Sequence, residues 1–230
     1  QRHEDWPNAH WVTAQPEVSA ITAAAATAVI EADWVWVAGQ KLLPVADLPM
    51  PGEHNRQNVL MAVAAAHLAG ISPEAIAQGV RTFPGVPHRL EPIIRQAGVT
   101  FINDSKATNY DAAEVGLCSV TGPVVLIAGG EPKTGEDGPW LARIKEKAVT
   151  VLLIGQAASA FAERLNQVGY HSHKQVESLE VAVPLAATLA KTHSAKTVLL
   201  SPACASFDQY RSFEHRGEHF RQLCEALPPA

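Results

Sequence analysis

Seven consecutive residues, 103–109, carry an acid, a lysine, two hydroxyls and two amides, and they follow directly on a mostly apolar run at 99–102. In open α/β sheets, ligands bind beyond the carboxyl ends of the strands, next to the helices that follow. Asp104 and Lys106 share a face only if extended strand geometry continues as far as these two residues. Two interpretations stay open from these residues alone: a polar turn with a structural ion pair, or one wall of a ligand site.

A glycine-rich segment, residues 129–135, follows the apolar run at 124–128 and carries Lys133. Glycine allows the backbone to approach a ligand closely, and Lys133 offers a mobile cation for a carboxylate or a phosphate. Neither the Gly-x4-Gly-Lys-Ser/Thr spacing of a phosphate loop nor a Gly-x-Gly-x-x-Gly dinucleotide motif occurs in the chain. The segment is therefore either an anion-binding loop of another kind or a solvated loop.

Small residues and hydroxyls follow the buried-type run at 197–200 and include Ser206, with the aromatic Phe207 beside it. Such a segment exposes backbone N–H groups that can bind a carboxylate. Phe213 follows where the last predicted helix begins. Cys204 is a candidate nucleophile by residue type, but the spacing identifies no activating base, so a buried small residue is the favoured interpretation.

The start of a predicted helix contains two amides, Asn55 and Asn58, on one face of its first turn. In a purely structural interpretation Asn55 is the N-cap of this helix. In a functional interpretation both amides face a nucleotide. Arg89 follows a linker at residues 84–87, where a cation can reach a phosphate when two domains close.

Helices and strands must position these residues. Few such elements are predicted before the linker at residues 84–87. The predicted elements are a helix at 19–32, a hairpin of 34–37 with 41–43, a helix at 55–69 ended by Gly70, and a helix at 73–82 capped by Ser72. Beyond the linker, strands and helices alternate. The predicted strands are 91–95, 100–102, 124–128, 150–154 and 197–200, and the predicted helices are 111–119, 138–147, 156–168, 178–192 and 214–226.

Near-continuous β-branched runs separated by helices are typical of a mostly parallel sheet that is covered by helices. The strands at 91–95 and 100–102 are predicted to form a hairpin around Ala97 and Gly98. We therefore predict an α/β fold with two domains, residues 1–86 and residues 87–230.

Composition and charge exclude several classes of protein. The 230 residues carry a net charge of −5 without a cluster of Lys or Arg, which argues against a nucleic-acid partner. The longest apolar stretch, residues 20–30, is too short for a membrane span and lacks the features of a signal peptide. Three cysteines without metal-ligand spacing predict a reducing, cytoplasmic location and no metal site. Because the sequence opens at Gln1 without methionine, we expect a piece of a longer protein.

Taken together, four motifs resemble those of the Mur ligase family, which builds peptidoglycan precursors; they are residues 52–55 with Asn58, 87–89, 103–109 and 201–217. The first two are shared across the family, whereas the last two are typical of its D-glutamate-adding branch. The resemblance implies that residues 1–86 are the C-terminal part of the central ATP-binding domain. It also implies that residues 87–230 are the whole Rossmann-like C-terminal domain, which binds the incoming amino acid.

The resemblance implies an amide-forming ligase. In that reaction ATP phosphorylates the terminal carboxylate of UDP-N-acetylmuramoyl-L-alanine, and the amine of D-glutamate attacks the acyl phosphate. By matching position, Asn55, Asn58 and Arg89 are expected to contact ATP. Asp104 is expected to hold the ribose, and Lys106, like Arg89, is expected to act in the catalytic cleft. The side chains expected around D-glutamate are Thr108, Lys133, Ser206, Phe207 and Phe213, with Lys133 as the partner of the side-chain carboxylate.

The resemblance also implies ATP and Mg²⁺ as cofactors, a monomeric enzyme, and a phosphate loop and metal ligands upstream of Gln1. The chain alone is therefore expected to be inactive. Two alternatives stay open: a ligase like folylpolyglutamate synthase, which also adds glutamate, and a non-catalytic Rossmann-like domain that binds a small anion. Comparing D- with L-glutamate, and a UDP-sugar acceptor with a folate, separates the two ligases.

Overall fold

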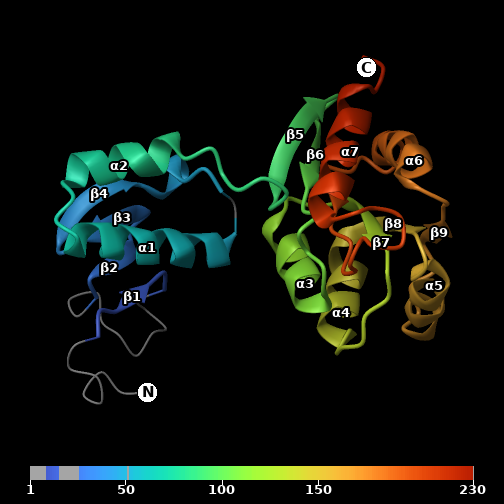
Figure 1. Cartoon of the computed structure of the whole chain (residues 1–230), viewed down its shortest axis with the longest axis horizontal. Helices are drawn as coiled ribbons and strands as arrows, with labels where there is room; N and C mark the ends of the chain where they lie inside the picture. The colour runs from blue at the N-terminus through green and yellow to red at the C-terminus, as the bar shows by residue number, and fades with distance from the viewer. Residues whose placement is uncertain (1–8, 16–25, 51, 230) are drawn as a thin grey trace. The chain divides into compact units, whose positions relative to one another are not determined.

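The computed structural model describes residues 9–15, 26–50 and 52–229. Contacts divide the chain into two compact units, Gln1–Gly85 and Val86–Ala230 (Figure 1). Each unit has hydrophobic clusters of its own. Among the described residues, no helix combines the length and the apolar character needed to cross a membrane.

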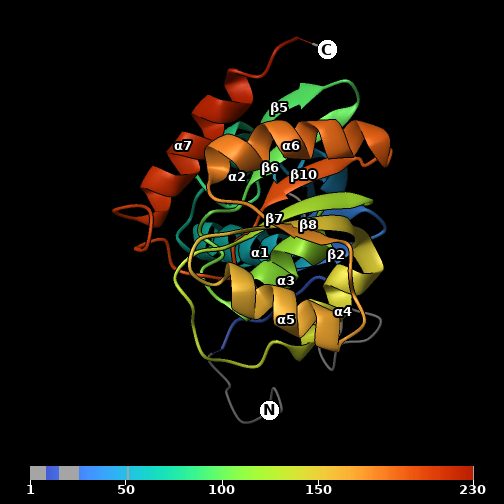
Figure 2. The same ribbon diagram turned by 90° about the vertical axis from the view of Figure 1, so that its right-hand side faces the viewer.

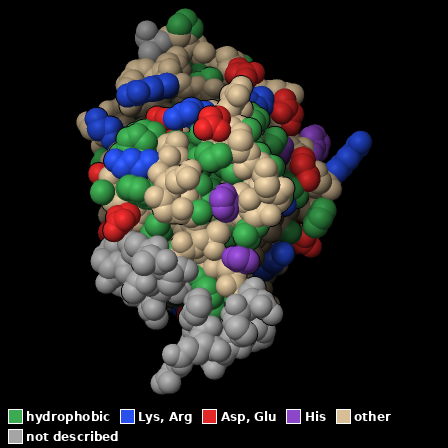
Figure 3. Space-filling model, turned by 90° about the vertical axis from the view of Figure 1, so that its left-hand side faces the viewer, with side chains coloured by type: hydrophobic (Ala, Val, Ile, Leu, Met, Phe, Trp, Pro, Cys, Tyr) green, Lys and Arg blue, Asp and Glu red, His purple; other side chains and the backbone are tan. Residues whose placement is uncertain are grey.

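The first unit packs two helices on a small sheet with the strand order β1-β2-β3-β4. Its elements are β1 (Val12–Thr13), β2 (Ala28–Glu31), β3 (Trp34–Val37), β4 (Gln40–Pro44), the short 3-10 helix η3 (Val45–Asp47), α1 (Glu53–Leu68) and α2 (Pro73–Thr82). The predicted hairpin and both later helices are confirmed, including Ser72 as the N-cap of α2 and a positive φ of 81° at Gly70. On the face shown in Figure 3, basic and acidic side chains lie interspersed among hydrophobic ones.

Two predictions for the first unit are wrong. The helix expected at 19–32 is a strand, β2, over Ala28–Glu31, while residues 19–25 lie outside the described part. Val29 and Ile30 are β-branched, and pairing of β2 with β3 outweighs the helix propensity of the alanines around them. Asn55 is not the N-cap of α1 either: the N-cap is Gly52 with φ 97°, and Asn55 is buried within the first turn.

The second unit contains the predicted sheet, which confirms the fold class. Its strand order is β5-β6-β10-β7-β8-β9, and every neighbouring pair is parallel except the hairpin of β5 with β6. The strands are β5 (Glu91–Gln96), β6 (Val99–Asn103), β7 (Val124–Gly129), β8 (Ala148–Ile154), β9 (His173–Gln175) and β10 (Thr197–Leu200). The polar edge strand β9 was not predicted, because its three residues carry no apolar pattern.

Helices cover both faces of this sheet (Figure 2). They are α3 (Tyr110–Ser119), α4 (Gly138–Lys147), α5 (Ala158–Gln167), α6 (Leu179–Thr192) and α7 (Phe213–Glu225). Alternate residues of β7 point to opposite faces, so Val124 and Leu126 join the core under α3, α4 and α5. Val125 and Ile127 join the core under α6 and α7.

The three central strands β6, β10 and β7 are parallel neighbours, so their carboxyl ends meet at one edge of the sheet. The helices that follow β6 and β7 pack on one face, whereas α7, which follows β10, packs on the other. Divergence of this kind opens a crevice at the carboxyl edge of a parallel sheet. The segments brought together there are 104–109, 130–137 and 201–212.

Candidate functional site at the carboxyl edge of the second sheet

Backbone hydrogen bonds join the three segments that leave the central strands. The N–H of Asp104 donates to the carbonyl of Leu200 at 2.8 Å, and the N–H of Ala203 donates to the carbonyl of Ala107 at 3.0 Å. The N–H of Glu131 donates to the carbonyl of Ala205 at 3.0 Å. The structure therefore brings together the three strand exits that the sequence singled out.

Arg216, on α7, is a buried cation that ties two of these segments together. Arg216 is only 1% exposed. The guanidinium donates to the hydroxyl of Ser105 (3.0 Å) and to the carbonyls of Ser105 (2.9 Å), Cys204 (3.1 Å) and Ala205 (3.2 Å). Burial is the largest influence on its pKa and lowers it to about 10. Sequence reasoning assigned Arg216 no role, because nothing in its neighbours reveals that a lone arginine near a helix start is buried.

Asp104 points into the protein. Its carboxylate accepts hydrogen bonds from the hydroxyl of Ser201 at 2.8 Å and from the N–H of Leu90 at 3.3 Å. It also lies against Gly116 of α3, where a Cβ would come within 2.3 Å of Oδ2. Burial raises the pKa of Asp104 to about 7, although Ser201, Leu90 and Arg89 act in the opposite direction. Strand β6 ends at Asn103, so Asp104 and Lys106 do not share the strand face considered for them.

The raised pKa of Asp104 predicts a pH dependence of stability. The folded state holds this proton more tightly than the unfolded state, so the contribution of Asp104 to stability is fully present below pH 4 and is lost as pH rises to about 7. We expect the wild-type chain to lose roughly 2–3 kcal/mol more unfolding free energy than Asp104→Asn between pH 5 and pH 8. Urea unfolding at the two pH values measures this, with the exposed Asp111→Asn as a control for loss of a charge. Parallel pH profiles for wild type and Asp104→Asn contradict the prediction.

The turn after β6 holds the first residues of α7. The hydroxyl of Ser105 donates to the carbonyl of Phe213 at 2.8 Å. The ammonium of Lys106 lies 4.3 Å from the centre of the Phe213 ring, within the range of a cation–π contact. Two predicted site residues, Lys106 and Phe213, are thus in contact, and Thr108 lies partly exposed on the same turn.

The segment after β10 carries a buried hydroxyl without a partner. Ser206 is 2% exposed, and its Oγ makes no hydrogen bond among the described residues. Such orphan groups are uncommon in native proteins and need an explanation such as a bound ligand. Its neighbour Phe207 is 69% exposed, which is unusual for a large aromatic side chain. Cys204 is buried, as predicted, and burial raises the pKa of its thiol to about 12.

Lys133 lies exposed on the segment between β7 and α4. The carbonyl of Lys133 accepts a hydrogen bond from the hydroxyl of Tyr110 at 3.3 Å. At the end of the segment, Arg164 grips the carboxylate of Asp137 through two hydrogen bonds of 2.7 and 2.8 Å. This contact with Arg164 lowers the pKa of Asp137 below its ordinary value. Both ends of the segment are thus anchored, while the ammonium of Lys133 stays accessible.

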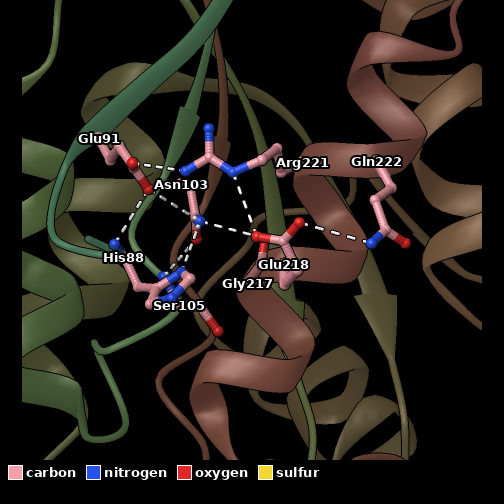
Figure 4. Close-up of polar contacts among 8 residues, drawn as sticks. All are labelled: His88, Glu91, Asn103, Ser105, Gly217, Glu218, Arg221 and Gln222. Carbon is pink, nitrogen blue, oxygen red and sulfur yellow. Dashed lines mark hydrogen bonds and ion pairs between the residues drawn. The ribbon is translucent and has the colours of Figure 1, made fainter.

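A second polar network holds the start of the unit next to α7 (Figure 4). The carboxylate of Glu91 accepts from the N–H of His88 (3.1 Å) and from the amide of Asn103 (3.4 Å), and it pairs with Arg221. The Asn103 amide also donates to the carbonyl of Gly217 at 3.2 Å and lies 3.0 Å from Nδ1 of His88. Sequence reasoning missed this network, because its members come from three distant segments.

Two carboxylates hold the strained residues on either side of Arg89. His88 and Leu90 have positive φ values of 63° and 45°, which non-glycine residues rarely adopt. Each donates its N–H to a carboxylate, that of Glu91 for His88 and that of Asp104 for Leu90. Arg89 lies exposed between these two anchored neighbours.

The remaining predicted site residues lie in the first unit. Asn55 is buried in the first turn of α1, whereas Asn58, three positions later, is exposed. Their contact with a nucleotide stays a prediction, as do the individual ligand contacts predicted in the second unit. Among the described residues, no group of three or more His, Cys, Asp or Glu side chains lies together in a way that can hold a metal ion.

Known proteins resemble the chain over most of its length. The D-glutamate ligase of Thermosynechococcus vestitus, named UDP-N-acetylmuramoylalanine–D-glutamate ligase, is 57% identical over 222 residues, which are 96% of this chain and 49% of the relative. The protein of the same name from Synechocystis sp. is 54% identical over 224 residues, 96% of this chain and 50% of the relative. The chain thus spans about half the length of these curated relatives.

Solved structures share the fold at low sequence identity. A Mycobacterium tuberculosis folylpolyglutamate synthase complexed with ADP has a TM-score of 0.62 and 18% identity, over 88% of this chain and 47% of that one. The UDP-N-acetylmuramate-alanine ligase MurC of Thermotoga maritima has a TM-score of 0.60 and 16% identity, over 97% of this chain and 57% of that one. The family model described as Mur ligase, glutamate ligase domain, matches residues 88–204. The chain belongs to the Mur ligase family, as its motifs predicted.

Proposed function

We propose that this chain is the amino-acid-binding part of an ATP-dependent ligase that joins D-glutamate to UDP-N-acetylmuramoyl-L-alanine. In this reaction a carboxylate oxygen of the acceptor attacks the γ-phosphorus of ATP, which forms an acyl phosphate and releases ADP. The amine of D-glutamate then attacks the acyl carbon, loses a proton and displaces phosphate. More than half of the aligned positions are identical to those of relatives that carry this name, which supports the proposal.

The observation that carries the proposal is the orphan hydroxyl of Ser206 at the meeting point of three strand exits. D-Glutamate has two carboxylates, so its site needs cations and hydrogen-bond donors held in place before binding. Ser206 and Thr108 supply hydroxyls, and Lys133 supplies an accessible cation on the segment whose Glu131 is bonded to Ala205. We assign the exposed Phe207 and the ring of Phe213 to the walls of the same site.

On the nucleotide side we propose Asn55, Asn58 and Arg89 as ATP contacts, with Lys106 and Arg89 acting in the catalytic cleft. A contact of Asp104 with the ribose requires access to a carboxylate that is only 6% exposed and that already accepts hydrogen bonds from Ser201 and Leu90. We place the Mg²⁺ ligands and the phosphate loop in the half of the enzyme that this chain does not span, and we therefore expect the chain alone to be inactive. We further propose that the enzyme is a monomer and that it is located in the cytoplasm, a reducing compartment that agrees with the three free cysteines.

Lys133→Ala tests the assignment of the D-glutamate site. In the full-length enzyme, loss of a charge-assisted contact should raise the KM for D-glutamate about 10- to 100-fold. The KM for ATP should change less than about twofold, since no ATP contact is assigned to Lys133. Steady-state kinetics measure both constants, and Lys174→Ala, at an exposed lysine of β9, is the matched control. An equal loss of affinity for both ligands rules out this role of Lys133.

The alternative of a folylpolyglutamate-synthase-like activity rests on likeness of fold alone. The solved synthases share 16–22% identity with the chain, whereas the D-glutamate ligases share 52–57%. A shared fold does not by itself carry an activity. The two motifs that resemble the D-glutamate-adding branch lie in the segments after β6 and β10.

A further inference from the structure

Tyr110, the first residue of α3, is part of an aromatic cluster between three helices. The centre of its ring lies 5.5 Å from that of Trp140 on α4 and 6.1 Å from that of Phe161 on α5. Trp140 and Phe161 are themselves 5.0 Å apart and buried. The Tyr110 ring therefore packs against two buried aromatic rings.

This ring lies against the segment that carries Lys133. A Cβ built on Gly135 would be 3.2 Å from Cδ2 and 3.5 Å from Cε2 of Tyr110, so the backbone of Gly135 rests on the ring edge. The hydroxyl of Tyr110 donates to the carbonyl of Lys133 at 3.3 Å. Burial raises the pKa of Tyr110 above its ordinary value, so the hydroxyl keeps its proton at neutral pH.

No other hydrogen bond of the described chain attaches residues 132–135 to the rest of the protein. These residues are all exposed, and the neighbouring anchors are at Glu131, which bonds to Ala205, and at Asp137, which bonds to Arg164. Ordering a free backbone residue on binding costs a factor of about five or more in affinity. A segment already held at its middle avoids that cost.

We propose that Tyr110 is a positioning residue that holds the Lys133 segment in its binding conformation, and so sets the affinity for the amino-acid substrate without contacting it. The inference rests on the proposed role of Lys133 toward a carboxylate of D-glutamate. Tyr110 grips only the backbone of Lys133, which leaves the ammonium available to the ligand. A merely structural tyrosine would change stability and affect all substrates alike.

The test uses the full-length enzyme with Tyr110→Phe, which keeps the ring and removes the hydroxyl. We expect the KM for D-glutamate to rise about three- to fivefold, as loss of one hydrogen bond predicts, while kcat, the KM for ATP and the melting temperature stay unchanged. Tyr110→Leu also removes the ring under Gly135 and should raise the same KM further. The matched control is Tyr170→Phe, which deletes a buried tyrosine hydrogen bond to the carbonyl of Ala148 (3.0 Å). This control should lower stability and leave the KM unchanged.

A double-mutant cycle with Lys133→Ala completes the test. If Tyr110 acts through Lys133, Tyr110→Phe should add nothing to the KM in the Lys133→Ala background. A full additive effect in that background overturns the inference. So does an unchanged KM in both Tyr110 variants while Lys133→Ala raises it, and the proposed role of Lys133 then stands. If Lys133→Ala itself leaves the KM for D-glutamate unchanged, the proposed role of Lys133 fails first and the inference fails with it.

Discussion

Replacing Arg216 with methionine should destabilise the second unit by about 3–5 kcal/mol. Methionine fills a similar volume but leaves the carbonyls of Ser105 and Cys204 buried without their donor, whereas the carbonyl of Ala205 keeps the N–H of Glu131. Each buried acceptor without a partner costs about 1–3 kcal/mol. Removal of the buried charge offsets part of this loss of stability, because burial is unfavourable for the charged guanidinium and lowers the pKa of Arg216. Urea unfolding followed by circular dichroism measures the change.

Two further variants make the Arg216 result specific. Arg211→Met removes an exposed arginine from the same stretch of chain and should change stability by less than about 0.5 kcal/mol. Arg216→Lys keeps the charge but not the planar set of donors, so its stability should lie between those of wild type and Arg216→Met. A methionine variant as stable as wild type would show that Arg216 does not hold the segments after β6 and β10 together.

Gly217→Ala should destabilise the second unit by about 2–3 kcal/mol, although glycine to alanine in a helix ordinarily stabilises by up to about 1 kcal/mol. The new Cβ would lie 2.3 Å from Nδ1 of His88 and 3.0 Å from the amide nitrogen of Asn103. Helix α7 or the His88 ring must therefore shift, which breaks the network around Glu91 (Figure 4). Thermal and urea unfolding of the variant measure the loss.

The matched control for this change is Gly79→Ala in α2. Gly79 is also a helix residue, but a Cβ there meets nothing within 4 Å. It should therefore leave stability unchanged or raise it by up to about 1 kcal/mol. If the alanine variants at Gly217 and Gly79 behave alike, helix propensity and not the contact with His88 governs both positions.

Much of the second unit could be predicted from the sequence. The runs that became β7, β8 and β10 are apolar and rich in β-branched residues, and helical segments separate them along the chain. These signals are local, because the pattern of apolar residues and the length of an element depend on adjacent residues. They were sufficient to predict the parallel sheet and the edge of this sheet at which the loops meet.

Predictions from the local sequence were wrong where the structure depends on contacts with other segments. Strand β2 lies in an alanine-rich stretch whose helix propensity is overruled by its pairing with β3. Strand β9 has no apolar pattern and exists because β8 offers it a parallel edge. The N-cap of α1 is Gly52 and not Asn55. The chain enters the helix with a φ of 97° at Gly52, which suits glycine and not an asparagine N-cap.

For the site, the sequence by itself determined which segments lie at the carboxyl edge, and its motifs determined the family. The tertiary structure alone decided which side chains are buried there: Asp104 turned inward, Ser206 left without a partner, and Arg216 enclosed. Arg216 and its partner Ser105 are 111 positions apart, and no local pattern records that they meet. Burial sets the free energy of a charge or a hydroxyl, and burial is a property of packing between distant segments.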